Sequence, residues 1–408
     1  MHLGGLARRF GVVAVTAVAV AVAVTGCSAE GKGGDGSAGA CDGPGVTADR
    51  VKIGFIYSDS GPGSSVLSFA RAGVDARIGL ANDTGGVNGR RLVYDWRDDG
   101  SSPSENAHVT EELVQDKSVF GLISATAAAG GSLDSLSAHG IPITGLANPA
   151  WVKYSNLFAY MYDVSPAVTA RYIQAGGGTK AAFVMTGSPD FTVQAIERFK
   201  AAFAAVGVST TETISYASGV DSPIQVARQI VNSGADSIVA FTAPEDLVEI
   251  LQATGTAGPN FFNTVVSVTG YDRTVLRTFG PQLAGVSFSV NFHPFESQNV
   301  AMDQYRNAMA RFAPESTEPE QQFALYGYLY ADLFIRGLEL AGDCPTREGF
   351  IESLRKVTDY DAGGLIDPVD LNANRTQPLQ CNAFVRINPA GTAFDINRAR
   401  LCADGSGT

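Results

Sequence analysis

Short loops of small polar residues follow several of the strands predicted below, and their hydroxyls and main-chain amides are the groups that could do chemistry. The first loop, residues 58–65 (SDSGPGSS), precedes a predicted helix. Unpaired N–H groups and the dipole at the start of a helix attract a carboxylate or a similar anion. Ser60, Ser64 and Ser65 are therefore candidate ligand contacts. The alternative is that Ser64 or Ser65 only caps its own helix.

A second loop, residues 124–131 (SATAAAGG), also places hydroxyls before a predicted helix. Both loops follow the carboxyl end of a strand, which is where open α/β sheets bind ligands. These loops therefore predict a site that binds a small polar group.

Catalytic patterns are missing from the sequence. Three histidines follow the amino-terminal segment, and none belongs to a nucleophile or metal-ligand motif: His108, His139 and His293. Residues 176–180 (GGGTK) resemble a phosphate loop, but the spacing is wrong and the segment precedes a strand. Asp98 and Asp99 are adjacent, so on an extended chain they point in opposite directions. We predict that the protein is not an enzyme and has no cofactor or metal.

The amino terminus reads as an export signal with a lipobox. Arg8 and Arg9 precede an Ala/Val-rich run, which closes on Val-Thr-Gly-Cys at residues 24–27. The run is shorter than the roughly 20 residues of a membrane-spanning helix. We predict a lipoprotein signal peptide over residues 1–27, with Cys27 acylated and anchored on the extracytoplasmic face of the cell membrane. Residues 28–47 are rich in Gly, Ser and Ala and predict a flexible linker.

Length, charge and cysteine content constrain the fold and the partners of the chain after the signal peptide. Removal of the 26 residues before Cys27 leaves 382 of 408, which suits two lobes better than one core. A net charge of -12 disfavours nucleic acid as a partner. With Cys27 acylated, the remaining cysteines allow three pairings in an oxidising compartment: Cys41, Cys344, Cys381 and Cys402. We expect two disulfides and favour Cys344 with Cys381 and Cys41 with Cys402.

Hydrophobic periodicity predicts two βαβ series, and hence an α/β fold of two doubly wound parallel-sheet lobes. The first has strands at 51–57, 91–97, 119–124 and 141–144, with helices near 66–83, 104–116 and 131–139. The second has strands at 181–185, 211–216, 237–241 and 263–268, with helices near 191–206, 223–233, 244–254 and 274–279. A strand at 286–292, helices near 300–312, 321–341 and 346–357, and a hairpin at 381–387 and 392–396 complete the chain.

These last segments indicate a hinge that the chain crosses several times. We assign residues 48–163 and 292–362 to lobe I, and residues 164–291 and 363–408 to lobe II.

Specific segments resemble the type 1 periplasmic binding proteins of the leucine/isoleucine/valine-binding family. They are VKIGFIY at 51–57, SGP at 60–62, ANDTGGVNGRRL at 81–92, Asp98-Asp99, Pro103, residues 114–124, GIP at 140–142 and IVNSGADSIV at 230–239. The resemblance runs from residue 51 to about residue 396. It implies a clamshell receptor that closes over a small solute and presents it to the permease subunits of an ABC importer. We expect a monomer.

The resemblance also implies ligand-binding residues. In lobe I these are the hydroxyl of Ser124 or Thr126 with the main chain of Ala125, and the next loop at Ala147 and Asn148. In lobe II the implied contacts are Phe191, Thr242 and Tyr271, with Tyr326 below the cleft. Each aromatic could equally be part of the core.

One departure concerns the ligand. Amino-acid binders of the resembled family place an acidic side chain near residues 268–271, where this chain has Val-Thr-Gly-Tyr and Asp272 one step beyond. A branched-chain amino acid, or a related carboxylate or amide, therefore remains open as the solute. A ligand-sensing surface receptor without a transport role is the alternative, and a secreted enzyme is a remote one.

Overall fold

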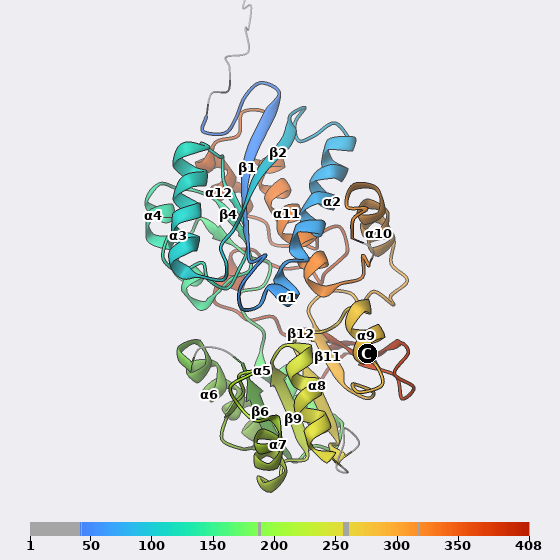
Figure 1. The fold of residues 1–408 in the computed structure, drawn as a ribbon. Coiled ribbons are helices and arrows are strands. Elements are labelled where there is room, and N and C mark those ends of the chain that lie inside the picture. Colours follow the sequence, from blue (N-terminus) through green and yellow to red (C-terminus); the bar gives the residue numbers. More distant parts are fainter. Residues whose placement is uncertain (1–40, 42, 187–188, 256–260, 317, 408) are drawn as a thin grey trace, which may run out of the picture. The chain divides into compact units, whose positions relative to one another are not determined.

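A computed structural model describes residues 41, 43–186, 189–255, 261–316 and 318–407, without the side chains of 189–195 (Figure 1). The predicted signal peptide, including Cys27, and most of the linker lie outside the described residues. Among the described helices, none combines the length and the apolarity needed to cross a bilayer.

The first sheet is parallel throughout, with the order β2-β1-β3-β4-β5. Its strands are β1 Arg50–Tyr57, β2 Arg91–Asp98, β3 Leu122–Ala125, β4 Ile143–Gly145 and β5 Leu157–Phe158. Consecutive residues of β1 are buried, as expected of a central strand covered on both faces.

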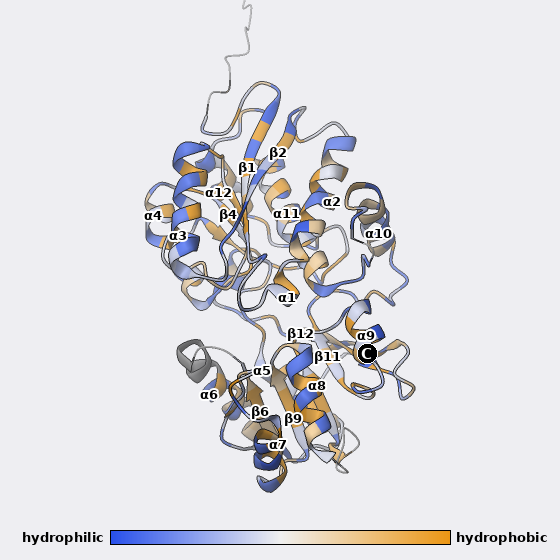
Figure 2. Cartoon of the chain, viewed as in Figure 1, coloured by the Kyte–Doolittle hydropathy of each residue, from blue (hydrophilic) through white to orange (hydrophobic). Residues whose placement is uncertain are grey.

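Helices of both early and late sequence accompany this sheet. They are α1 Ser64–Leu67, α2 Ala70–Asp83, α3 Pro103–Glu111, α4 Leu133–Ala138, α10 Val300–Phe312, α11 Gln322–Leu340 and α12 Arg347–Leu354, with the short helical turns Glu112–Asp116 and Pro149–Lys153. Of these helices, α2, α3 and α11 contact the strands of the sheet, whereas α10 packs on α2 and α12 on α11. Much of α3 is hydrophilic, whereas α11 is mostly buried (Figure 2).

The second sheet has the order β13-β12-β11-β10-β9-β6-β7, with β8 also paired to β6. Its strands are β6 Lys180–Met185, β7 Ser209–Thr210, β8 Ile214–Ser215, β9 Ser237–Phe241, β10 Thr264–Ser267, β11 Ser287–Val290, β12 Cys381–Ile387 and β13 Phe394–Cys402. Among the described strands, the antiparallel pairings are β11 with β12 and β12 with β13. The accompanying helices are α5 Pro166–Ala175, α6 Pro189–Ala205, α7 Pro223–Asn232, α8 Pro244–Ala253 and α9 Arg273–Phe279.

The chain passes between the two sheets three times: after β5, after β11, and after α12. Both sheets with their helices confirm the predicted fold class. We call them the first and second lobes, while the residue boundaries given above stay a prediction.

Several element predictions need correction. The strand predicted at 211–216 is two short strands, β7 and β8. Helix α5 and strand β5 were not predicted. Helix α5 begins at Pro166, whose fixed φ suits the first helical position, and it is rich in β-branched and aromatic residues that weaken a helical signal.

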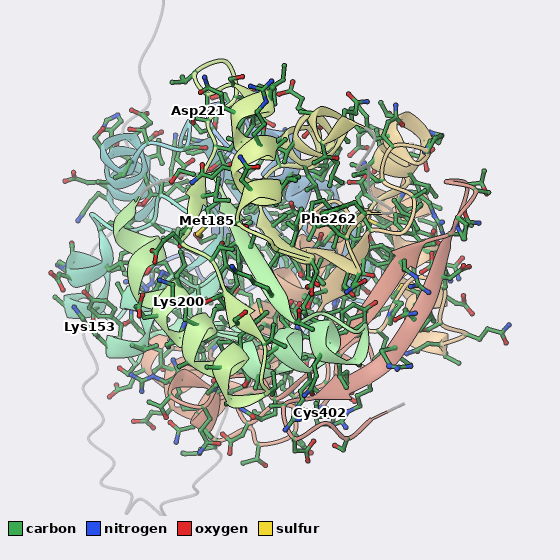
Figure 3. The ribbon with its side chains drawn as sticks, turned by 90° about the horizontal axis from the view of Figure 1, so that it is seen from below. Lys153, Met185, Lys200, Asp221, Phe262 and Cys402 are labelled. Carbon is green, nitrogen blue, oxygen red and sulfur yellow. A yellow bond between two sulfur atoms is a disulfide. The ribbon has the colours of Figure 1, made fainter. Side chains whose placement is uncertain are left out.

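The predicted disulfide pairing is wrong, although the number of disulfides is confirmed. Cys41 pairs with Cys344, and Cys381 with Cys402, which Figure 3 labels. Strand β13 extends to Cys402 and places it directly opposite Cys381 on β12. The hairpin therefore brings the sulfurs of Cys381 and Cys402 together, which leaves Cys41 and Cys344 to pair with each other.

Candidate functional site

The loop after β1 is fixed by two aspartates. Asp98 accepts hydrogen bonds from the Ser60 main-chain N–H (3.2 Å) and hydroxyl (2.6 Å). Asp99 is fully buried and accepts from the Ser58 hydroxyl at 2.9 Å. These two carboxylates therefore hold the loop in place.

Helix α1 follows a left-handed Gly63 (φ 91°) and has no side-chain cap. Glycine suits this position because it has no Cβ to clash at positive φ. Ser64 is half-buried and Ser65 is exposed. Neither serine acts as the helix cap, so their hydroxyls are not committed to that role.

At the end of β3 and in the loop after it, one hydroxyl has hydrogen-bond partners and one has none. Thr126 is 1% exposed, its oxygen lies 3.1 Å from Ser58 Oγ, and it accepts from the N–H of Ala128 (2.9 Å). Ser124 is 4% exposed and its Oγ has no hydrogen-bond partner. Ala125 between them is fully buried. An unpartnered buried hydroxyl is costly in a folded protein, and a bound ligand could satisfy it.

The loop after β4 is tied to the loop after β3. Asn148 Oδ1 accepts from the N–H of Ala150 (2.9 Å), while its Nδ2 donates to the Ala129 carbonyl (3.0 Å). Ala147 is half-buried beside it. The structure thus brings together the two first-lobe loops that the resemblance implied, and Asn148 joins them.

In the second lobe, Thr242 follows β9 and repeats the pattern of Ser124. It is 3% exposed and its Oγ1 has no partner, while its carbonyl accepts from the Thr269 hydroxyl at 2.7 Å. Met185, labelled in Figure 3, ends the neighbouring strand β6. Position 191 belongs to α6, but the side chain of Phe191 lies outside what the structure describes.

The two tyrosines lie in aromatic clusters. Tyr271 is fully buried, stacks on Phe295 with ring centroids 5.0 Å apart, and donates its hydroxyl to Glu296. Tyr326 is 6% exposed and lies against Phe292. In this conformation Tyr271 offers no hydroxyl to a ligand, and its place on the closing face stays a prediction.

Gln322 is a polar residue that the sequence reasoning missed. It begins α11, is 4% exposed, and donates from Nε2 to the Val268 carbonyl (3.0 Å) and to Tyr326 (3.1 Å). Its Oε1 has no partner. Periodicity identified the helix, but the contact with a loop 54 residues away in sequence depends on tertiary structure.

Two of the three acidic side chains discussed near the second-lobe loops already accept hydrogen bonds from within the protein. Asp272 caps α9 by accepting from the N–H of Val275 (2.7 Å), and burial raises its pKa to about 6. Asp246 is buried, accepts from Thr186 (3.1 Å), and its pKa is raised by burial. Glu245, at the start of α8, is exposed. No group of acidic, histidine or cysteine side chains in the described ranges could hold a metal ion.

A cavity of about 260 Å³ lies at the crossing segments, lined among others by Tyr160, Asn291, His293, Asp367 and Asn382. It contains none of the ligand residues implied by the resemblance. Hydrogen bonding to Asp367 raises the pKa of His293, and that bond together with Arg400 lowers the pKa of Asp367 to about 2. The cavity therefore belongs to the crossing segments and not to the strand-end loops.

Comparison with solved structures gives the same fold. A fatty acid ABC transporter substrate-binding protein from Thermomonospora curvata has a TM-score of 0.75 at 17% identity, over 90% of this chain and 97% of that one. A leucine binding protein from Thermotoga maritima has a TM-score of 0.72 at 18% identity, over 87% and 99%. A solute binding protein from R. palustris in complex with benzoate has a TM-score of 0.70 at 18% identity, over 85% and 96%.

No curated protein matches the chain by sequence. The sequence profile described as periplasmic binding protein, however, matches residues 50–392. That range holds both sheets almost completely and every described candidate loop. The family consists of binding proteins and not enzymes, as expected from the sequence, and this chain belongs to the periplasmic binding protein family.

Proposed function

We propose that the protein is an extracytoplasmic solute-binding lipoprotein of an ABC importer, and that it binds a small solute between the two lobes. The observation that carries this proposal is the pair Ser124 and Thr242. Ser124 is the penultimate residue of β3 and Thr242 follows β9, so each lies at the carboxyl end of a parallel strand, one in each sheet, and each has a buried hydroxyl without a partner. A solute that reaches both would favour lobe closure, because only the closed state satisfies both hydroxyls.

The solute proposed is a small molecule with a carboxylate or amide group. Fatty acid, leucine and benzoate, named for the structural neighbours, share a carboxylate. Hydroxyls and main-chain amides suit such a group. Asp272 is committed to capping α9, Asp246 accepts from Thr186, and Glu245 is exposed, so none of the three offers a free buried counter-charge to an ammonium group. An amino acid is therefore a less favoured solute than a carboxylate or amide without an amine.

A thermal-shift screen tests the solute class. The probes are leucine, isovalerate, isovaleramide, hexanoate and benzoate, because binding raises stability with the logarithm of ligand excess. We expect stabilisation by at least one carboxylate or amide, and compaction in small-angle scattering with the same compound. Failure of all five probes in both measurements would contradict the proposed solute class.

Variants connect that result to the site. Ser124→Ala and Thr242→Val should each weaken binding of the active probe about tenfold, which corresponds to one lost hydrogen bond of about 1.4 kcal/mol. Ser135→Ala, at an exposed position of α4, is the matched control and should leave affinity unchanged. Equal affinities in all three variants would contradict the placement of the site.

The lipid anchor and the permease partner complete the proposal. Acylation at Cys27 would hold the receptor beside the permease, and two acyl chains bind a bilayer far more stably than one. Cells expressing the full chain and fed radiolabelled palmitate should incorporate label into the protein. Cys27→Ala should abolish the labelling, and labelling that persists in this variant would contradict the anchor.

A further inference from the structure

The segment 318–322 links α10 to α11 of the first lobe, yet it contacts the second lobe. Gln321 pairs with Asp272 in an isolated antiparallel bridge. Next to it, the N–H of Arg273 donates to the Glu320 carbonyl at 3.3 Å. These main-chain contacts join the lobes at a place where the chain itself does not cross.

Charged side chains reinforce this contact. Glu320 accepts from Arg273 of α9 at 2.6 Å and from Arg306 of α10 at 2.8 Å, and its side chain is 17% exposed. Arg273 also pairs with Glu296 at 3.0 Å, and Arg277 pairs with Glu318. Partly buried pairs are screened less than exposed ones, and separating them would leave charges buried without partners.

Gln322 extends the contact to the loop after β10. Its Nε2 donates to the Val268 carbonyl at 3.0 Å, and the side chain is almost completely buried. Residues 268–272 include Tyr271, which the family resemblance implies as a ligand contact of the second lobe. A residue of the first lobe thus fixes the main chain of a loop in the second.

We infer that segment 318–322 is a fourth, non-covalent connection between the lobes. It positions the loop 268–272 and stays intact while the three covalent crossings bend. Glu320 and Gln322 are its positioning residues. The inference deepens the proposed function, on which it rests for the view that the solute binds between the two lobes.

Hydrogen–deuterium exchange of the protein without solute tests the positioning. Glu320→Gln and Gln322→Met should each raise amide exchange in residues 268–272 by about tenfold and leave residues 124–131 unchanged. The control Asp83→Asn breaks an ion pair with Arg311 inside the first lobe and should leave both loops unchanged. Unchanged exchange in 268–272, or an equal rise in both loops from general destabilisation, would overturn the inference.

A reversible crosslink tests whether the contact persists on closure. In Asp272→Cys/Gln321→Cys, the two positions lie opposite each other in the bridge, a separation that suits a disulfide. Oxidised and mildly reduced forms are compared with the active probe among leucine, isovalerate, isovaleramide, hexanoate and benzoate. We expect dissociation constants within twofold, and a loss above tenfold on oxidation would overturn the inference. If no probe binds the wild type, the proposed solute class fails, while the exchange result still decides this inference.

Discussion

Cys41 is bonded to Cys344, 303 residues further along the chain, and the bond ties the start of the described chain to the segment after α11. Such a bond stabilises the fold mainly by restricting the unfolded chain, more so for longer loops. We predict that Cys41→Ser/Cys344→Ser lowers the free energy of unfolding by about 3 to 5 kcal/mol. Denaturant unfolding under oxidising conditions measures this.

The second disulfide provides the comparison. Cys381 and Cys402 are only 21 residues apart and already aligned by β12 and β13. Replacing both with serine should cost about 2 kcal/mol less than removing the long-range bond. If the short-range pair proved the more costly to remove, loop length would not govern stability here.

The cysteines also show what sequence reasoning could reach. Their even number and the export signal predicted two disulfides. The pairing failed because periodicity ended the last strand at residue 396, whereas β13 continues to Cys402. Exposed and intermediate residues dominate the middle of that strand, so alternation gave no signal there. Register across a hairpin is set by pairing, which the sequence of one strand does not contain.

Close contact between α2 and α11 depends on two glycines. A Cβ on Gly327 would lie 2.0 Å from the Ala70 carbonyl oxygen, and one on Gly73 would lie 1.8 Å from that of Ala324. Main-chain atoms cannot move aside as a flexible side chain does, so we predict that Gly327→Ala destabilises the protein by about 2 to 3 kcal/mol or prevents folding. Thermal unfolding measures the change.

Gly130→Ala is the matched control for that experiment. A Cβ at position 130 meets no atom within 4 Å, and this glycine is not at positive φ. The free energy of unfolding of Gly130→Ala should stay within about 0.5 kcal/mol of that of the wild type. A tolerated Gly327→Ala would mean that the two helices can separate without cost.

Asp272 should make stability depend on pH. Burial raises its pKa from 3.8 to about 6, so the folded state holds the proton more tightly than the unfolded state. The stabilising effect of that proton is fully present below about pH 4 and is lost as the pH rises through about 6. We predict that Asp272→Asn, which keeps a good helix cap, becomes more stable than the wild type by about 1 to 3 kcal/mol between pH 4 and 7.

Urea unfolding of both proteins across this pH range measures the difference. The two stability curves should diverge towards neutral pH. Parallel curves would mean that Asp272 titrates alike in the folded and unfolded states.

For the candidate site, the sequence predicted where the loops lie better than which contacts their side chains make. Strand ends identified the loops at 58–65, 124–131 and 145–148, because ligand loops follow parallel strands whatever their residues. The hydrogen-bond and packing partners of a side chain depend on neighbours far along the chain. Tyr271 faces Glu296 and the aromatic cluster, and Gln322 reaches Val268, and neither relation is encoded in local spacing.

The effects of the two hydrogen bonds of Asn148 can be measured separately. Its Oδ1 accepts from Ala150, and its Nδ2 donates to Ala129 in the neighbouring loop. Asn148→Asp keeps the first bond and loses the second, whereas Asn148→Ala loses both. We predict that each variant lowers stability by about 2 kcal/mol: Ala loses two bonds of about 1 kcal/mol each, and Asp loses one and also places a carboxylate oxygen against the Ala129 carbonyl oxygen. If the tie between the loops positions Ser124, both variants should weaken binding of the active probe to a similar extent. A defect confined to Asn148→Ala, measured by calorimetry beside the unfolding curves, would instead assign the effect to the cap at Ala150.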